Sequence, residues 1–480
     1  MQSPIRFVRH LCAALVLIIS AAMVLNARAA EPPKPGSPRP NVLFIALDDL
    51  NHWVGHLDRN KQTKTPNIDR MAKLGTTFTH AYCAAPVCNP SRAALMSGLR
   101  PGATGVYDNH HDWRDAIPAA QTLNTTFRNA GYRVTGAGKI YHGAYEREEE
   151  WDDYLHSKGD PASKTPVSDT PLRPFGPVDK PDSEWSDYKT VDYGIAELGK
   201  THEQPCFVAV GLHKPHMAWN VPRKYYDMHP LDKIELPPFQ ENDLDDLPKG
   251  GRAMAKPNEH DKIVKAGRWK EAIQGYLAAV SFADAQVGRL LDALEKSPER
   301  DHTIVVLWGD HGWHLGEKHH WRKFALWEET TRAPLIWIVP GVTTAGTRCE
   351  RTVDFMSIYP TLCDLCGIEA PKHLQGVSIR PLLADSQAAW DRPGITTFGF
   401  KNHAVRTAGW RYIRYADGGE ELYDEAKDPY EWKNLANDPN FAQQKAELAA
   451  LLPVDNKPDT ERERQKQSKR AQRAAAKDDD

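Results

Sequence analysis

Side chains that can bind metals, move protons or neutralise anions directly follow four short apolar runs of the sequence. In chain order these residues are Asp48, Asp49, Lys139, His142, His213, Lys214, His216, Asp310 and His311. Carboxylate oxygens are the ligands that Ca²⁺ and Mg²⁺ prefer, lysines neutralise an anionic substrate, and histidines transfer protons. A divalent cation beside lysines is suited to the hydrolysis of a sulfate or phosphate ester.

The apolar runs predict the sheet that positions those residues. They are short and continuously apolar, which is typical of parallel strands buried on both faces. The four runs, together with a fifth that no such cluster follows, are 41–47, 133–137, 206–212, 303–308 and 335–339. Segments with helical periodicity, such as 66–74 and 273–294, lie between them and indicate an α/β sandwich around a mostly parallel sheet.

The carboxyl ends of parallel strands are where such sheets bind ligands, so the four clusters should converge on one site. For any single cluster, a helix cap or a turn former is the better interpretation of an aspartate after a strand. Four clusters with matching strand polarity favour an active site.

Composition excludes several classes of protein. The chain has 480 residues, of which 40% are hydrophobic and 26% charged, so it is not a collagen, a coiled-coil rod or a wholly disordered chain. Its formal net charge of −3 argues against nucleic acid as the main partner. Residues 1–30 combine a basic start, an apolar run and Ala27-Arg28-Ala29, which predicts a secretory signal peptide, with an uncleaved anchor as the alternative. No later segment is apolar for long enough to span a membrane, so we expect a periplasmic or secreted protein without stable membrane insertion.

Changes in composition and hydrophobic pattern along the sequence predict its domains. After the signal peptide we expect a Pro-rich linker at 31–39, a catalytic α/β domain at 40–385, a small C-terminal α+β domain at 386–453 and a disordered charged tail at 454–480. Short strand-like pieces at 394–400, 403–407, 410–414 and 421–423 predict an antiparallel sheet in the small domain, followed by a helix around 441–452. Polar segments at 146–186 and 220–262 are expected to shape the mouth of a pocket.

Cys363 and Cys366 lie three positions apart in a segment that reads as a helix. They are compatible with a core face, half of a metal site or a strained disulfide. Because the sequence has no second such pair, zinc is disfavoured and buried thiols are the favoured interpretation.

Cys88 is different, because it stands just before a helix that we expect to begin near Ser91. Charge that develops on residue 88 would then face a helix N-terminus, although a buried cysteine before a cap is the simpler alternative. The segment Cys88-Asn89-Pro90-Ser91-Arg92, followed by Ser97-Gly98-Leu99-Arg100-Pro101, resembles the signature of the type I sulfatases. In that family the cysteine is oxidised to formylglycine (3-oxoalanine) after translation.

The resemblance extends from residue 39 to about 452 and is closest to the iduronate-2-sulfatase branch of the family. It is carried by Thr65-Pro66-Asn67-Ile68-Asp69, Gly138-Lys139-Ile140-Tyr141-His142, the run from Ala209 to His216, and Gly309-Asp310-His311-Gly312-Trp313. It implies an alkaline-phosphatase-like α/β domain, with a mostly parallel sheet sandwiched by helices, and a smaller C-terminal antiparallel sheet domain.

The resemblance also implies individual roles. The ligands of Ca²⁺, with Mg²⁺ as the alternative ion, would be Asp48, Asp49, Asp310, His311 and the oxidised side chain of Cys88. Histidine is an unusual ligand for a hard ion, so His311 could instead orient the nucleophile. Arg92 would steady the formylglycine, His142 would lie beside its hydroxyl, and Lys139, His213 and Lys323 would contact the sulfate. His213 is our first choice of general acid, and His216 is either a sugar contact or a turn residue.

By the same resemblance, the chain is expected to be a sulfuric ester hydrolase that acts on a sulfated sugar. The first candidate substrate is a 2-O-sulfated iduronate, and the next is a related polysaccharide unit. The resemblance also implies a maturase that oxidises Cys88. A phosphatase or phosphonate monoester hydrolase of the same superfamily is the alternative. A non-catalytic carbohydrate-binding relative would be expected to lack Cys88, Lys139 or Asp310. The segments 146–186 and 219–226 and the small domain should form the rim, where Arg223 and Lys224 either meet a uronate carboxylate or are a solvated loop face.

Overall fold

The structure, a computed structural model, describes residues 39–459 except 115, 119–120, 144 and 157–158. The predicted signal peptide and nearly all of the predicted linker lie outside the described residues, as does 460–480 of the predicted tail. Within the described part of the chain, no helix is both long and apolar enough to cross a membrane.

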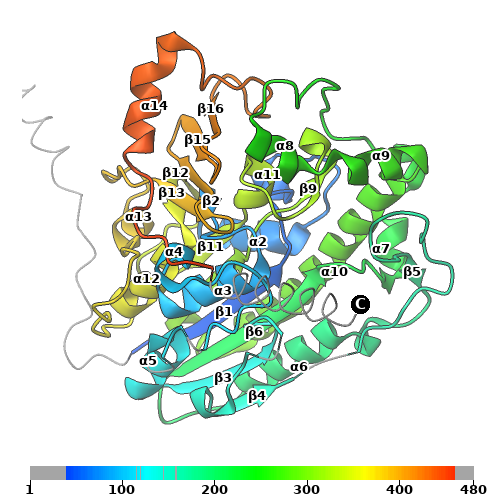
Figure 1. Ribbon diagram of the computed structural model, residues 1–480. Helices are drawn as coiled ribbons and strands as arrows, with labels where there is room; N and C mark the ends of the chain where they lie inside the picture. The colour runs from blue at the N-terminus through cyan, green and yellow to red at the C-terminus, as the bar shows by residue number, and fades with distance from the viewer. Residues whose placement is uncertain (1–38, 115, 119–120, 144, 157–158, 460–480) are drawn as a thin grey trace, which may run out of the picture.

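An eight-stranded sheet lies at the centre of the larger part of the molecule (Figure 1), in the order β12-β2-β11-β8-β1-β6-β3-β4. Its strands are β1 (Asn41–Asp48), β2 (Thr76–Tyr82), β3 (Arg133–Gly138), β4 (Asp153–Leu155), β6 (Cys206–Pro215), β8 (Thr303–Gly309), β11 (Leu335–Ile338) and β12 (Thr347–Asp354). All neighbouring pairs are parallel except those that β11 makes with β2 and β8. The predicted mostly parallel α/β sheet is therefore confirmed, with one reversed strand inside it.

Helices cover both faces of this sheet. The helices that precede the C-terminal sheet in the described part of the chain are α2 (Pro66–Leu74), α3 (Cys88–Ser97), α4 (Pro101–Thr104), α5 (Leu123–Asn129), α6 (Ser186–Leu198), α7 (Arg223–Asp227), α8 (Lys249–Ala255), α9 (Pro257–Lys265), α10 (Trp269–Lys296), α11 (Glu328–Thr331), α12 (Ile358–Leu365) and α13 (Arg380–Ala384). Strand β1 contributes Leu43 and Ile45 to a core shared with α2, α6 and α10, and Val42 and Phe44 to a second core shared with α3, α5 and α12. This alternation follows from the two-residue period of a strand and explains why β1 is apolar throughout.

The register of the central strands brings their carboxyl ends to one edge of the sheet. Leu47 of β1 is level with Leu212 of β6 and Gly309 of β8. Gly138 of β3 is level with Gly211 of β6. The residues that follow these positions therefore leave the sheet side by side, as the clusters in the sequence predicted.

A second, four-stranded antiparallel sheet follows in the C-terminal region, with the strands β13 (Gly394–Thr397), β14 (His403–Arg406), β15 (Trp410–Arg414) and β16 (Glu420–Asp424) in sequential order. Helix α14 (Ala442–Ala449) packs on β15 (Figure 1). The predicted small antiparallel sheet is confirmed. It is joined to the larger part by buried ion pairs, of which Arg411 with Glu328 is one.

The predicted disordered tail begins at residue 454, but the structure places its first residues against the larger part. The backbone N–H of Lys457 donates to the carbonyl of Gly102 at 2.8 Å, and the Tyr107 hydroxyl donates to the carbonyl of Lys457 at 2.7 Å. Asp459 Oδ1 lies 3.0 Å from His111 Nε2. A segment without large apolar residues therefore makes polar contacts with the larger part as far as Asp459.

Cys363 and Cys366 are both buried and free, which agrees with the favoured interpretation of the sequence. Burial raises the pKa of each thiol to about 12, so both are inert at neutral pH.

Candidate active site

Strand β1 ends in two adjacent buried carboxylates. Asp48 is its last residue, and the pairing with β6 shifts register there. Asp49 follows with φ of 63°, so the chain turns sharply and both side chains stay in the interior. The backbone N–H of Asp49 donates to Asp310 Oδ1 at 3.0 Å, which joins the ends of β1 and β8.

Helix α3 begins at Cys88 itself, three residues before the predicted start at Ser91. Pro90 is tolerated there because the first turn of a helix leaves its N–H groups without intrahelical partners. The sulfur of Cys88 is buried, and it accepts from Lys323 Nζ at 2.7 Å and lies 3.5 Å from His311 Nε2. Burial and Asp48 raise the pKa of Cys88, but Lys139 and Lys323 outweigh them and lower it below its ordinary value.

Arg92 lies one helical turn after Cys88 and is completely buried. Its Nε donates to Asp310 Oδ2 at 2.8 Å, and its Nη1 donates to the carbonyls of Lys139 and Ile140. One guanidinium group therefore joins α3 to the ends of β3 and β8. A buried charge with this many partners fixes the relative positions of the site residues.

The two predicted lysines each hold one of the β1 carboxylates. Lys139 Nζ donates to Asp48 Oδ2, and Lys323 Nζ donates to Asp49 Oδ1 at 2.8 Å. Burial lowers the pKa of Lys323, but Asp49 and the neighbouring acidic groups outweigh it and raise it, so the ammonium is charged at neutral pH. The structure therefore brings both lysines into one charged cluster with Asp48 and Asp49.

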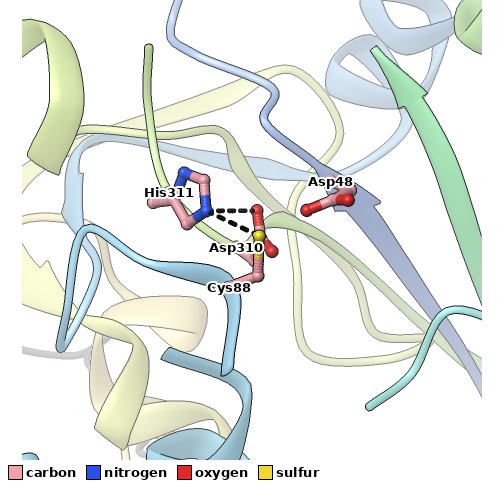
Figure 2. Close-up of side chains that lie close together, drawn as sticks. All are labelled: Asp48, Cys88, Asp310 and His311. Carbon is pink, nitrogen blue, oxygen red and sulfur yellow. Dashed lines mark hydrogen bonds and ion pairs between the residues drawn. The ribbon is translucent and has the colours of Figure 1, made fainter. Parts of the chain in front are cut away.

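His311 lies beside both Cys88 and Asp310 (Figure 2), and its Nε2 is 3.5 Å from Asp310 Oδ1 and from Asp49 Oδ1. Burial lowers the pKa of His311, but Asp310 and Cys88 outweigh it and raise it to about 9. His216, which the sequence left open, lies with Nε2 3.8 Å from Asp49 Oδ2. It therefore belongs to the same cluster and is more than a turn residue.

His142 and His213 lie at the edge of the cluster. His142 is half-buried, and burial followed by Lys139 lowers its pKa to about 4, so it is neutral at pH 7. His213 is 38% exposed in its side chain, and its backbone N–H donates to Asp187 Oδ1 at 2.7 Å. Asp187 also accepts from the backbone N–H of Lys214, so it fixes the end of β6; nothing in the sequence indicated this partner.

The donor atoms of the cluster fit a metal ion. Asp48 with Cys88, Asp310 and His311 (Figure 2) brings its ligand atoms within 4.8 Å of one another, and so does the overlapping set of Asp48, Asp49, Cys88 and His216. Asp48 Oδ1 and Asp49 Oδ2 are buried without hydrogen-bond partners in the described part of the chain. Because an unpaired buried carboxylate oxygen is costly, these atoms indicate a hard cation such as Ca²⁺ or Mg²⁺.

A cavity of about 670 Å³ opens onto this cluster. It is lined by Asn109, His110, Lys139, His142, Asp160, Pro161, Arg173, His213, Lys214, His216, Met217, Ala218, Asn220, Trp313, Arg322, Lys323 and Phe324. The segment 146–186 therefore contributes to the rim, as expected. The small C-terminal sheet does not, because none of the described residues that line this cavity comes from 386–453.

Of the two interpretations of Arg223 and Lys224, the structure agrees with a solvated loop face, because both side chains are exposed and neither lines this cavity. Both line a different cavity, where Arg223 pairs with Asp179 and Lys224 pairs with Asp182. Asp179 and Asp182 come from the segment 146–186 and neutralise the two cations. The local sequence around Arg223 and Lys224 does not reveal these partners.

Comparison with protein families gives two matches. Residues 40–368 match the family described as Sulfatase, and residues 316–457 match the C-terminal region of N-sulphoglucosamine sulphohydrolase. A protein of Formosa agariphila named sulfatase is 39% identical, over 87% of each chain. Human iduronate 2-sulfatase is 26% identical over 83% of this chain and 91% of its own, and a Δ4,5-hexuronate-2-O-sulfatase of Bacteroides thetaiotaomicron is 29% identical over 86% and 88%.

Solved structures agree on the fold. A 2-O GAG sulfatase superimposes with a TM-score of 0.67 at 25% identity, over 86% of this chain and 91% of its own. A phosphonate monoester hydrolase of Agrobacterium radiobacter superimposes with a TM-score of 0.73 at 22% identity, over 86% and 94%. The second likeness shows the fold alone.

Proposed function

The chain belongs to the sulfatase family and is a sulfatase, and we propose that it removes O-sulfate from a sulfated sugar with a formylglycine made from Cys88 and a bound Ca²⁺. The observation that supports this most strongly is the setting of Cys88. Its sulfur lies at the first turn of α3, beside Lys323 and next to a cluster of carboxylates that fits a cation. A group that acts as a nucleophile on an anionic ester needs this combination of charges.

The metal would be held by Asp48, Asp49 and Asp310, with the oxidised side chain of residue 88 and His311 completing the set. Ca²⁺ would supply positive charge that favours the ionised nucleophile and offsets charge on the ester. In the structure Lys139 and Lys323 hold Asp48 and Asp49. A bound cation would share these carboxylates, and both ammonium groups would then be available to the sulfuryl oxygens.

Oxidation of Cys88 by a maturase would replace the thiol with an aldehyde. As its hydrate, this group would supply one hydroxyl to attack sulfur, while the S–O bond to the sugar alcohol breaks. The second hydroxyl would then lose its proton and re-form the aldehyde C=O bond, while the C–O bond to sulfate breaks and sulfate leaves. Residue 88 is the first residue of α3, a ten-residue helix, and the dipole of that helix favours negative charge there. Arg92 would keep Asp310 in place through its bond to Oδ2.

Two histidines of the cavity can serve the proton transfers. His142 is neutral at pH 7 and can accept a hydrogen bond from a hydroxyl at position 88. His213 is fixed by Asp187 at the end of β6 and faces the cavity, so we assign it the role of general acid that protonates the leaving alcohol.

The substrate is proposed from the relatives. Two of them are named for 2-O-sulfated uronates, one as iduronate 2-sulfatase and one as Δ4,5-hexuronate-2-O-sulfatase. We propose a 2-O-sulfated uronate of a glycosaminoglycan-type chain, or a related polysaccharide unit, as the substrate. We also propose that the chain is exported after removal of residues 1–30, which N-terminal sequencing of the exported protein would test.

One set of assays tests the reaction and the substrate together. Defined sulfated disaccharides are incubated with the enzyme, and the products are read by mass. Loss of sulfate from uronate 2-sulfates is expected, whereas activity on galactose sulfates alone would remove the uronate proposal. The fold shared with a phosphonate monoester hydrolase makes that activity the second candidate, and matched aryl sulfates, phosphates and phosphonates separate the two.

A further inference from the structure

Most cations that line the active-site cavity are neutralised by a nearby carboxylate. Lys139 pairs with Asp48, and Lys323 pairs with Asp49. Lys214 pairs with Asp160 at 3.1 Å. Three of the positive side chains of the cavity are therefore balanced in the absence of substrate.

Arg173 is the exception. It lines the same cavity and is exposed, and within the described part of the chain no hydrogen bond or ion pair engages its guanidinium. It comes from the insertion 146–186, outside the strand-end clusters that form the reaction centre. Among the residues that the structure describes, the cavity thus holds one free guanidinium, and it lies outside the clusters that would contact the sulfate.

Arg322 fixes the segment that carries Arg173. Its Nη2 donates to the carbonyl of Pro171, two residues before Arg173, at 2.8 Å, and pairs with Glu259 at 3.2 Å. Its Nε is buried without a partner in the described part of the chain, and its backbone has φ of 72°, a strained value for arginine. Because Arg322 directly precedes Lys323, it links the reaction centre to the segment that carries Arg173.

We propose that Arg173, supported by Arg322, forms a second anion subsite that binds a second negative group of the substrate. This inference rests on the proposed function and narrows its substrate class to sulfated sugars with at least two anionic groups. A planar guanidinium matches a carboxylate or a sulfate with paired hydrogen bonds. The cavity volume of about 670 Å³ lies within the range of sites that enclose a ligand larger than one small anion.

The nearby carboxylates of Asp160 and Glu259 do not neutralise Arg173, because other groups already pair with them. Asp160 Oδ2 is held by Lys214, and its Oδ1 accepts from the backbone N–H and hydroxyl of Ser186. Glu259 is engaged by Arg322. A carboxylate or sulfate of the substrate would therefore be the first anion that Arg173 meets.

The test compares Arg173→Gln with the parent enzyme on four substrates. These are an aryl sulfate, a uronate 2-sulfate disaccharide, the same disaccharide with its carboxyl group esterified, and a disulfated neutral sugar. Because charged hydrogen bonds are lost, KM for the substrates with a second anion should rise about tenfold or more beyond any change for the aryl sulfate. If the larger rise of KM is limited to the free uronate, the ligand of Arg173 is a carboxylate. If it is limited to the disulfated sugar, the ligand is a second sulfate.

An equal change of KM on all four substrates, or no change on any, would overturn the subsite. Arg223→Ala is the matched control, since it removes an exposed arginine from the neighbouring cavity. Arg322→Lys, checked by its melting temperature, should raise KM for the same substrates more weakly if it folds like the parent. Failure of the parent enzyme to release sulfate from any substrate would refute the proposed function instead, so the two failures are distinguishable.

Discussion

The ammonium nitrogen of Lys323 lies 2.7 Å from the sulfur of Cys88, although 235 residues separate them in the chain. The same nitrogen donates to Asp49 Oδ1 at 2.8 Å. One lysine therefore contacts both the proposed nucleophile position and a proposed metal ligand. Together with Lys139, the charge of Lys323 makes a negative group at position 88 tolerable in a buried site.

Replacement of Lys323 by Ala should lower kcat about 10²- to 10³-fold, because a positive group aimed at the developing charge is lost. Lys214→Ala provides the comparison, since Lys214 lines the same cavity but is paired with Asp160 and is assigned no role in the chemistry. Single-turnover rates on an aryl sulfate give the measurement. Equal losses of kcat in the two variants would mean that Lys323 contributes only to the overall positive charge of the cavity.

Cys88→Ala should abolish turnover and leave the fold intact, because a methyl group fits the space of the thiol and offers no nucleophile. Cys206→Ala is the control, since that half-buried thiol lies at the start of β6, away from the cluster. Sulfate release and circular dichroism measure the two effects. Residual activity of Cys88→Ala above the uncatalysed rate would rule out residue 88 as the nucleophile.

Removal of metal should abolish activity and destabilise the fold. The carboxylates of Asp48, Asp49 and Asp310 lie together in the interior, and a cation that binds only the folded state stabilises it by about 2.7 kcal/mol at a hundredfold excess over Kd. Dialysis against a chelator, followed by return of Ca²⁺ or Mg²⁺, tests this through the melting temperature and kcat. An unchanged melting temperature after complete removal of bound metal, verified by elemental analysis, would contradict a metal site here.

Stability should fall as the pH is lowered from about 6.5 to about 4. Burial lowers the pKa of His229 to about 4, and its Nε2 lies 2.9 Å from Ser281 Oγ. In this window the unfolded chain takes up a proton that the folded chain excludes, so the free energy of unfolding decreases toward low pH. His229→Gln should flatten the pH dependence by up to about 2–3 kcal/mol, measured by denaturant titration. Replacement of the exposed His110 by Gln should leave the pH dependence unchanged. If the free energy of unfolding varied equally with pH in the two variants, His229 would not be the group responsible.

The segment 455–459 should help to hold the start of helix α3, which carries Cys88. Asp459 contacts His111, and the carbonyl of His111 accepts from Asn89 Nδ2 at 2.8 Å, one residue after Cys88. A chain that ends after residue 453 should therefore lose kcat several-fold, while one that ends after 459 should keep it. Matching rates in the two truncated chains would show that the contact is dispensable.

The strand-end clusters could be predicted from sequence because each depends on local pattern alone. A continuously apolar run becomes a buried strand, and the residue after it must leave the sheet at the edge shared by all parallel strands. Asp48, Lys139, His213 and Asp310 were found in this way. Strand β2 was missed, since its threonines interrupt the apolar pattern although the strand is buried.

The partners of those residues could not be predicted, because they depend on how distant segments pack. Nothing near Arg223 in sequence reveals Asp179, and nothing near His213 reveals Asp187. The polar contacts of Lys457 and Asp459 could not be foreseen for the same reason, since nothing near them in sequence reveals Gly102 or His111. Side-chain pairing across insertions is a tertiary property with no local signal.

The chemistry at position 88 is the central claim, and peptide mass spectrometry of the active enzyme tests it most directly. The peptide that contains Cys88 and Arg92 should carry an aldehyde in place of the thiol, and a carbonyl-specific reagent should label it in proportion to activity. Fully active protein in which that peptide retains an unmodified thiol would contradict the account.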